Sequence, residues 1–512
     1  MNVLRSSAIY SFFTSISRIF GFLRDIFIAN FLGTGVIADI FFVAFRLPNT
    51  FRRIFSEGAL NSAFVPIYTR LIKDNLPQES GKFAGSIFLI FLTVSLLVVL
   101  IIEIFMPFFI EIIAPGFKND LEKFNELVKV SRVIFPFLIL ISISSIFSSI
   151  LNSHNRFALS AALPIILNIT LIIALVIAAY TAADFLLFLL WSVIIAGLFQ
   201  IILLVIVLIR KKISFIFTTK IYSNYIKRFL KLFSASFFSS GLLQINILIG
   251  TIIASYESGA ISYLYYADRI YQLPLALIGI AISVALLPSI SSKIKSESLD
   301  KIHQSIEQTL LYSLLFAVPA TVGIYVLSEQ IISVLFERGE FDEKSSFFTS
   351  KALKFYTLGL VAFILMKIYT PIFFAYENAK PTLFITAINL AINTTLSIVL
   401  FIKVGFIGIP IATSVSAWIS VLLMSYYLKK LNYYRLSNGI ILPTTIIMIG
   451  SLIIYLYLFF LTEFSWIFFD LLYNHEIIFL LFSVLSSILL YFIIISFYKP
   501  FKYSEIIKIL QK

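Results

Sequence analysis

The sequence predicts an all-α polytopic membrane protein, and three observations lead to this fold class. Hydrophobic residues make up 60% of the 512-residue chain, and the mean hydropathy is +1.02. Charged residues make up 13%, about half the share of a typical globular domain. Apolar runs of roughly 20 residues, long enough to cross a bilayer core about 30 Å thick, follow one another along the chain. No long polar segment remains for a soluble domain.

We expect fourteen transmembrane helices, arranged as two pseudo-symmetric six-helix lobes and a C-terminal helix pair. The expected spans are residues 6–32, 35–66, 84–112, 130–152, 158–180, 184–209, 226–254, 260–290, 306–328, 352–375, 382–402, 406–428, 440–462 and 477–498. The expected lobes are residues 1–215 (helices 1–6) and 216–432 (helices 7–12), and residues 433–512 hold helices 13 and 14.

A short internal repeat supports the two halves. Helices 2 and 8 each carry an arginine, then a Leu-Pro pair and then a further proline: Arg46, Leu47-Pro48 and Pro66 in the first, and Arg269, Leu273-Pro274 and Pro288 in the second. A basic linker near residues 210–231 separates the halves. Parallel halves around a site at the midplane are a known transporter plan.

The distribution of lysine and arginine predicts the orientation. If the N-terminus is cytoplasmic, 23 of these residues lie in inside segments and 8 in outside loops. This bias follows the positive-inside rule and places both termini in the cytoplasm. The net charge of +13 therefore indicates topology and contact with anionic membrane lipids, and we expect no nucleic-acid partner.

Several kinds of chemistry are excluded or unexpected. The chain has no cysteine, so disulfides and thiolate chemistry are excluded. His154, His303 and His475 lie far apart near predicted loops, so we expect no metal site. No nucleotide-binding P-loop and no Ser/His/Asp arrangement occurs. We therefore expect no catalytic residue, no cofactor and no enzymatic activity. The N-terminal apolar run is too long for a cleavable signal and carries arginines.

The stretch from Ser17 to Pro66 organises the chain, because charged residues lie within two apolar spans. They are Arg18, Arg24, Asp25, Asp39, Arg46, Arg52, Arg53 and Glu57. Each arginine at the bilayer centre costs about 2.5–3.5 kcal/mol on insertion scales. Such residues are retained where they face a wet cavity or a partner. Since cations are in excess, the sequence indicates an anion that enters the membrane.

Helical spacing groups these residues on a few faces. Ser17, Gly21 and Arg24 share one face of helix 1, with Arg18 and Asp25 beside it; Asp39, Arg46 and Arg53 share one face of helix 2, with Asn49 one turn from Arg52. In helix 8, Asp268 and Arg269 lie at the matching point of the second half. Arginine suits bidentate contact with phosphate or carboxylate. The alternative is that the arginines pair with carboxylates of the protein itself, although the stretch from Ser17 to Pro66 has five arginines and only three carboxylates.

Two further polar features have simpler interpretations. Gln244, Asn246, Asn389 and Asn393 lie within spans, where amides usually bond neighbouring helices; a cation site is the alternative. Residues 336–342, Phe-Glu-Arg-Gly-Glu-Phe-Asp, are expected to form a solvated turn on the outside.

The motifs SRIFGFLRD and ADIFFVAFRLPNTFRRIFSEGALNSAFVPIY, followed by LNSHNRFALSAALP and YLYYADRIYQLPLALIGIAISVALLPSIS, resemble the MurJ/MviN family of lipid II flippases. VLFERGEFD and PIFFAYENAKPT extend the resemblance to about Thr382. It implies two lobes, a central cationic cavity and a final helix pair that holds the polyprenyl tail. One departure is Gly250, where some relatives carry an acidic residue of a sodium site.

The resemblance also implies roles for individual residues. The substrate-binding arginines match Arg18, Arg24, Arg52 and Arg269, and Asp39 matches an acidic position that positions or gates them. Ser17, Asp25, Asn49, Arg53 and Asp268 are expected to support them. The implied substrate is lipid II, an undecaprenyl-diphosphate-linked disaccharide-peptide, in the bacterial cytoplasmic membrane. We expect a monomer that contacts membrane lipids and cell-wall synthesis proteins.

Three alternatives stay open at this point. The chain could flip another polyprenyl-diphosphate oligosaccharide, export drugs, or serve as a non-transporting scaffold for cell-wall enzymes. A drug exporter should line its cavity with carboxylates and aromatic groups rather than arginines. A scaffold should tolerate Arg→Ala changes that a transporter does not.

Overall fold

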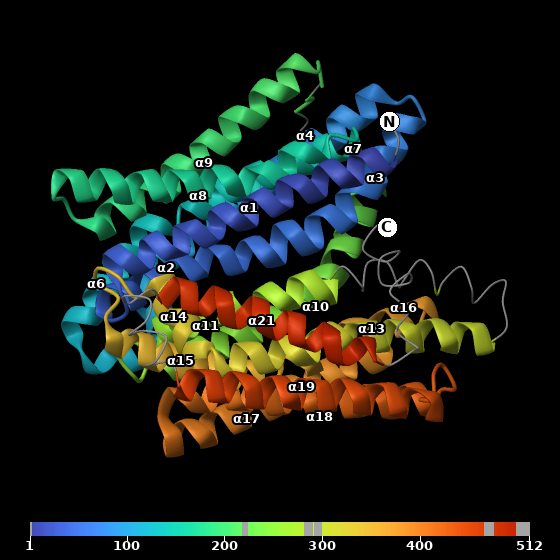
Figure 1. The fold of residues 1–512 in the computed structure, drawn as a ribbon. Helices are drawn as coiled ribbons and strands as arrows, with labels where there is room; N and C mark the ends of the chain where they lie inside the picture. The colour runs from blue at the N-terminus through green and yellow to red at the C-terminus, as the bar shows by residue number, and fades with distance from the viewer. Residues whose placement is uncertain are drawn as a thin grey trace. The chain divides into compact units, whose positions relative to one another are not determined.

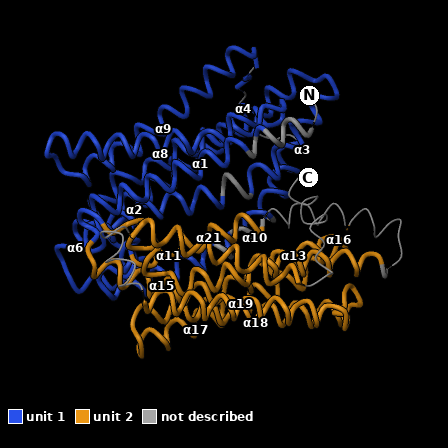
Figure 2. Tube along the Cα trace, viewed as in Figure 1, with its two compact units in different colours: residues 1–262, 338–341 blue, residues 263–337, 342–512 orange. Residues whose placement is uncertain are grey.

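The computed structural model describes residues 3–213, 215–217, 224–280, 290, 299–464 and 476–497. These residues form helices and turns without a β-strand, so the all-α prediction is confirmed. The chain divides into two compact units, which Figure 2 shows in different colours. Unit 1 is Met1–Ser262 with Arg338–Phe341, and unit 2 is Tyr263–Glu337 with Asp342–Lys512.

Unit 1 is an assembly of long helices with a few short ones. They are α1 (Val3–Leu32), α2 (Val36–Arg52), the π-helix η1 (Arg53–Leu60), α3 (Asn61–Lys73), α4 (Pro77–Ile104), α5 (Met106–Ile113), the 3-10 helix η2 (Pro115–Asn119), α6 (Leu121–Ile134), α7 (Phe137–Ser153), α8 (Phe157–Thr181), α9 (Phe185–Arg210) and α10 (Asn224–Ala254) (Figure 1). Helix α8 packs between α1 and α9, and α7 packs against α4 and α9. The apolar cluster around Phe64, Phe83 and Phe229 joins α3, α4 and α10.

Unit 2 contains the remaining helices. They are α11 (Ala260–Pro274), whose first turn belongs to unit 1, then the π-helix η3 (Leu275–Ile280), α13 (Leu299–Val326), α14 (Ser328–Phe336), α15 (Glu343–Thr357), α16 (Leu360–Ala375), α17 (Lys380–Val404), the 3-10 helix η4 (Gly405–Ile407), α18 (Gly408–Lys430), the 3-10 helix η5 (Asn438–Ile440), α19 (Ile441–Glu463) and α21 (Glu476–Ser496). Helices α17 and α18 pack against each other, and α19 packs against α13 and α21. Tyr491 of α21 donates from its hydroxyl to the Leu315 carbonyl of α13 at 2.8 Å.

The observed helices overlap every expected span, but the number of crossings stays a prediction. Within the described ranges, eight helical stretches are long and apolar enough to cross a membrane, or nine if the bent pair α15–α16 forms one span. Helices α1, α2 and α11 are outside this set. Helix α1 is excluded because its arginines and its aspartate lower its hydropathy, whereas α2 and α11, with 17 and 15 residues, are too short by themselves. The lobe bounds 1–215, 216–432 and 433–512 also stay a prediction.

The two helices of the sequence repeat share a structural feature. Helix α2 contains Pro48 and continues as the π-helix η1, and α11 ends at Pro274 and continues as the π-helix η3. Proline removes a backbone hydrogen bond, and π-helical stretches often accompany functional sites. Both repeat helices therefore lose regular α-helical geometry next to their arginines.

The expected outer turn is exposed at residues 337–340, but Phe336 and Phe341 are buried and the turn also bonds to the end of α1. Glu340 donates its backbone N–H to the Asn30 carbonyl near the end of α1, at 2.9 Å. Gly339 and Gly33 both have left-handed backbones, with φ of 58° and 59°. A Cβ on Gly339 would overlap Asn30, and a Cβ on Gly33 would overlap Glu340. Glycine at both positions is what lets the two backbones meet.

We expect Gly339→Ala to lower the thermal unfolding midpoint of the purified protein in detergent. The left-handed backbone costs an L-residue roughly 1–2 kcal/mol, and the added methyl would overlap the Asn30 carbonyl. Gly323→Ala in α13 is the control, because its added Cβ meets no atom within 4 Å. Equal midpoints for the two variants would contradict this account of the docked turn.

Candidate functional site

Arg24 of α1 lies in a buried polar cluster. Its Nε and Nη2 donate to Asp25 Oδ1 at 3.0 and 2.6 Å, and its Nη1 donates to Asn168 Oδ1 at 3.0 Å. Arg24 is 6% exposed and Asp25 is 1% exposed. In this conformation the Arg24 guanidinium is therefore neutralised by its neighbour in the chain, as the internal-pairing alternative foresaw.

Asn168 of α8 completes this cluster from a helix that carries none of the predicted site residues. It donates from Nδ2 to the Ser17 carbonyl at 3.2 Å. A Cβ on Gly21 would lie 3.3 Å from the same nitrogen, so the small residue makes room for the amide. Asn168 thus touches all three members of the predicted Ser17–Gly21–Arg24 face. An asparagine within an apolar span is the signal that could have identified it.

Asp39 forms a second buried cluster in unit 1. Its carboxylate is fully buried and accepts from the Gly259 N–H at 2.8 Å, the Ser262 N–H at 3.0 Å and the Ser262 hydroxyl at 2.6 Å. These donors belong to the first turn of α11, so Asp39 on α2 caps that helix. A carboxylate at a helix N-terminus satisfies free N–H groups and interacts favourably with the helix dipole.

Lys123 of α6 is the counter-ion of Asp39. Its Nζ lies 3.5 Å from Asp39 Oδ2 and 3.7 Å from the centre of the Phe117 ring. Lys123 is only 7% exposed, although it lies between the expected spans 84–112 and 130–152 and a loop lysine is usually solvated. No sequence pattern links residues 39 and 123, so this pairing was visible only after folding.

The remaining charged residues of α1 and α2 have more open surroundings. Arg52 donates from Nε to Asn49 Oδ1 at 3.2 Å, in agreement with their spacing of one turn. Arg46 donates to Thr251 of α10. Arg18 and Arg53 are exposed side chains, and the side chain of Glu57 lies outside the described residues. Asp39 and Arg46, seven positions apart, were predicted to share one face of α2. They contact different neighbours: Asp39 faces α6 and the first turn of α11, whereas Arg46 faces α10.

In unit 2, Arg269 lies against an aromatic neighbour. It donates from Nη2 to the Tyr265 hydroxyl at 2.7 Å, and its guanidinium lies 4.6 Å from the centre of the same ring. Tyr265 is one helical turn earlier on α11. Asp268 accepts from Gln272 on the same helix. The structure thus joins Ser17, Arg24 and Asp25, and separately joins Asn49 and Arg52. That Arg18, Arg24, Arg52 and Arg269 bind one ligand stays a prediction.

The amides predicted to join helices are confirmed in one case. Asn389 of α17 donates to the Ser420 hydroxyl of α18 at 2.8 Å. Across the described ranges, no three His, Cys, Asp or Glu side chains gather where they could hold a metal ion. His475 lies outside these ranges.

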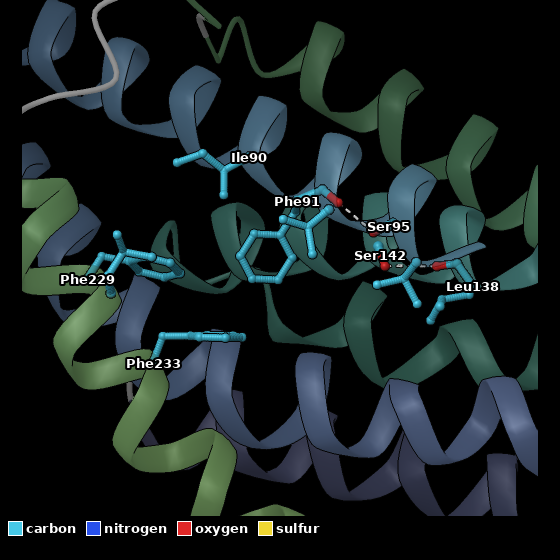
Figure 3. Close-up of a pocket in the computed structure, with 10 residues that line it drawn as sticks. Ile90, Phe91, Ser95, Leu138, Ser142, Phe229 and Phe233 are labelled. Carbon is cyan, nitrogen blue, oxygen red and sulfur yellow. Dashed lines mark hydrogen bonds between the residues drawn. The ribbon is translucent and has the colours of Figure 1, made fainter. Parts of the chain in front are cut away.

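An apolar cavity of about 110 Å³ lies between α4, α7 and α10 (Figure 3). Phe91, Phe229 and Phe233 dominate its lining. Its two serines donate to their own helices, Ser95 to the Phe91 carbonyl at 2.5 Å and Ser142 to the Leu138 carbonyl at 2.8 Å. The lining therefore offers no charged donor to an anion.

Comparison with known proteins gives one consistent family. The family model described as "Lipid II flippase MurJ" matches residues 28–475. A "Probable lipid II flippase MurJ" from Rhizobium tropici is 39% identical over 408 residues, 79% of this chain and 76% of that protein. Another from Rickettsia prowazekii (strain Madrid E) is 36% identical over 441 residues, 86% of each chain.

Solved structures agree with this family. A structure of lipid II flippase MurJ in an inward-closed conformation matches with a TM-score of 0.81 at 30% identity, covering 98% of this chain and all of that one. An inward-facing multidrug resistance MATE family transporter matches with a TM-score of 0.67 at 15% identity, over 81% of this chain and 94% of its own. The second likeness concerns the fold alone.

We expect Asn168→Ala to lower the thermal unfolding midpoint. The change leaves Arg24 Nη1 and the Ser17 carbonyl without this partner in a buried site, which typically costs about 1–3 kcal/mol per group. Thr170→Ala on the same helix is the control, because its hydroxyl donates to the Ile166 carbonyl within α8. A loss no larger than that of the control would show that the bridge contributes little.

We expect Asp39 and Lys123 to be energetically coupled. Asp39→Asn leaves a buried lysine without its counter-ion, and removing one partner of a buried pair typically costs about 3–5 kcal/mol. The double variant Asp39→Asn/Lys123→Met should lose less stability than the two single losses added together. Unfolding midpoints of the four proteins measure this; strictly additive losses would contradict the ion pair.

Proposed function

Because the chain belongs to the MurJ family of lipid II flippases, we propose that it moves lipid II from the inner to the outer leaflet of the bacterial cytoplasmic membrane. The chain is a multi-pass membrane protein. The proposed movement makes and breaks no covalent bond. The undecaprenyl tail stays in the membrane, and the diphosphate carries the headgroup's negative charge through it.

The concentration of arginine in three helices of the expected membrane spans is the observation that carries this proposal. Arg18 and Arg24 lie on α1, Arg52 ends α2 and Arg269 lies on α11. A phosphate-bearing headgroup is the anion that these side chains suit, since a guanidinium offers several N–H donors in one plane. In our proposal these four arginines hold the diphosphate in a central cavity that opens alternately to each side.

Because Arg24 is already paired within the protein, a bound diphosphate would have to replace one of its present acceptors. Asp25 and Asn168 now accept the guanidinium N–H groups. In our proposal the diphosphate replaces Asp25 as the anionic acceptor, while Asn168 holds the guanidinium in place. Asp25 thus keeps the buried cation compensated when the site is empty, and its competition weakens binding enough for release. Arg53, Asn49, Ser17 and Asp268 support the site from beside the arginines.

Asp39 would gate the cycle rather than bind substrate, because its carboxylate already accepts three hydrogen bonds from the start of α11 and pairs with Lys123. Since α11 carries Arg269, a change at this cap would be felt along the helix that bears a proposed substrate ligand. The final helices α19 and α21 are the proposed groove for the lipid tail.

The test is growth complementation in a strain depleted of its own lipid II flippase. We expect the unchanged chain to restore growth, and Arg24→Ala and Arg269→Ala to fail at equal membrane abundance. Loss of one ligand to a buried phosphate weakens a charge-assisted contact of about 1.5–3 kcal/mol, roughly tenfold or more in affinity. Arg435→Ala, in a loop of unit 2, is the control and should restore growth.

The other outcomes separate the alternatives. Rescue by both arginine variants would remove these residues from the site and favour a scaffold. Failure of the unchanged chain despite good expression would favour another undecaprenyl-linked substrate. Flipping of lipid II by the purified protein in vesicles then measures transport directly.

A further inference from the structure

Unit 1 contains a second cavity, and this one has a polar lining. It is formed by residues other than those of the proposed substrate site. It has a volume of about 500 Å³, within the usual range for small-ligand sites. Three chain turns meet there: the turn between α3 and α4, the turn between α7 and α8, and the turn after α9. Arg156, Lys211 and Lys212 supply three cations to its lining, and none of the described residues that line it is acidic.

All three turns are built in the same way. Each helix ends with a residue in the left-handed conformation: Asn75, Asn155 and Lys212, with φ of 55°, 59° and 52°. The following N–H groups, of Leu76, Arg156 and Ile213, donate back to the carbonyls of Leu71, Leu151 and Leu208 at 3.1, 2.9 and 3.2 Å. This is the Schellman arrangement, in which backbone N–H groups satisfy the last carbonyls of a helix.

The helix ends therefore do not engage the three cations. Lysine and arginine near a helix C-terminus often bond its free carbonyls, but here backbone amides occupy that role. Within the described part of the chain, the side chains of Arg156, Lys211 and Lys212 make no ion pair or hydrogen bond. The nearby carboxylates have other partners: Asp74 pairs with Arg70 at 3.6 Å, and Glu79 pairs with Lys82 at 3.2 Å.

Two of the turns also begin helices whose first N–H groups lack a side-chain acceptor. The N-cap residues of α4 and α8 are Leu76 and Arg156, and neither caps its helix by a side-chain bond. A helix N-terminus carries roughly half a positive charge and favours anions, whereas a C-terminus carries roughly half a negative charge. The two N-termini at the cavity therefore offset much of the negative charge of its three C-termini. Together with three side-chain cations, the cavity has a clear positive excess.

A further donor lies beside these groups. The Nε2 atom of His154 is buried and has no hydrogen-bond partner among the described residues. Its ring packs edge-on against Tyr68, with 5.9 Å between centroids. Burial lowers the pKa of His154, so the ring is neutral at pH 7 and offers one N–H donor.

We propose that this cavity binds the phosphate of an anionic phospholipid headgroup. Its turns lie at the ends of helical stretches apolar enough to cross a membrane, Leu121–Ser153, Phe157–Thr181 and Phe185–Arg210, which places it at the depth of lipid headgroups. Ile72 and Ile213 add an apolar wall, as a lipid requires and a free phosphate does not. By the predicted orientation, this headgroup belongs to the cytoplasmic leaflet, where basic pockets recognise anionic lipids.

The test measures binding to the purified full-length protein in a neutral detergent. The ligands are phosphatidylglycerol, phosphatidylcholine and inorganic phosphate, and native mass spectrometry counts bound lipid. We expect Arg156→Gln/Lys211→Gln/Lys212→Gln to weaken phosphatidylglycerol binding about a hundredfold, since three surface cations are removed. These side chains are exposed, so the unfolding midpoint of the lipid-free variant should stay unchanged.

The control removes the same charge from a similar place. Lys429 and Lys430 end α18 as Lys211 and Lys212 follow α9, and Arg435 lies in the next loop. Lys429→Gln/Lys430→Gln/Arg435→Gln should keep its affinity within about threefold, a difference of 0.6–0.7 kcal/mol by the usual conversion. Lys211→Arg/Lys212→Arg keeps the charge and should keep the binding.

Four results would overturn the proposal. They are unchanged affinity in the first triple variant, equal loss in the control, equal affinity of the unchanged protein for phosphatidylcholine, and full displacement of the lipid by inorganic phosphate. The last result would retain a phosphate site and reject a lipid as its source. None of these outcomes depends on lipid II transport, so they leave the proposed flippase function to its own experiment.

Discussion

The cost of placing a charge in a membrane is the constraint on which this structure depends. An arginine or aspartate at mid-depth needs an acceptor, a donor or water, because hydrocarbon provides none. The two buried clusters of unit 1 meet this need in different ways. Arg24 is compensated by Asp25 and Asn168, whereas Asp39 is compensated by Lys123 and by the first turn of α11.

These clusters also determine how the helices are arranged. Asn168 ties α8 to α1, and Asp39 ties α2 to α6 and to α11. The connections are short and specific, so they fix the register between helices where apolar packing alone would leave it loose. The same helices depart from regular geometry, since α2 and α11 each continue into a π-helix after a proline. Charge and backbone irregularity therefore occur together, on the helices proposed to bind substrate.

Pairing changes how a cationic site works. A free arginine in the membrane would bind the first anion it met and release it slowly. An arginine already held by a carboxylate exchanges one anion for another, so the net cost of binding and release is smaller. Under the proposed function, Asp25 acts as this resident anion for Arg24. The basic cavity at the turns of unit 1 differs, because its cations have no acid partner among the described residues.

Sequence by itself determined that each expected span contains a helix and where its charges lie, but not the breaks that divide α4 from α5, α6 from α7 and α15 from α16. These properties are local: span length, hydropathy and the spacing of Ser17, Gly21 and Arg24 follow from residues within one helix. The hydrogen bond between Asn49 and Arg52, one helical turn apart, could be predicted for the same reason. The predicted family followed from motifs, and the comparisons agree with it.

Tertiary structure decided which groups compensate those charges. The partners Asn168 and Lys123 lie 144 and 84 positions along the chain from Arg24 and Asp39, and no local pattern connects them. The turn at Gly339 was likewise expected to be solvated, and only the folded structure shows the hydrogen bond from its backbone, at Glu340, to the Asn30 carbonyl. The physical reason is that periodicity reports the direction a side chain takes from its own helix, whereas its partner depends on which helix packs there.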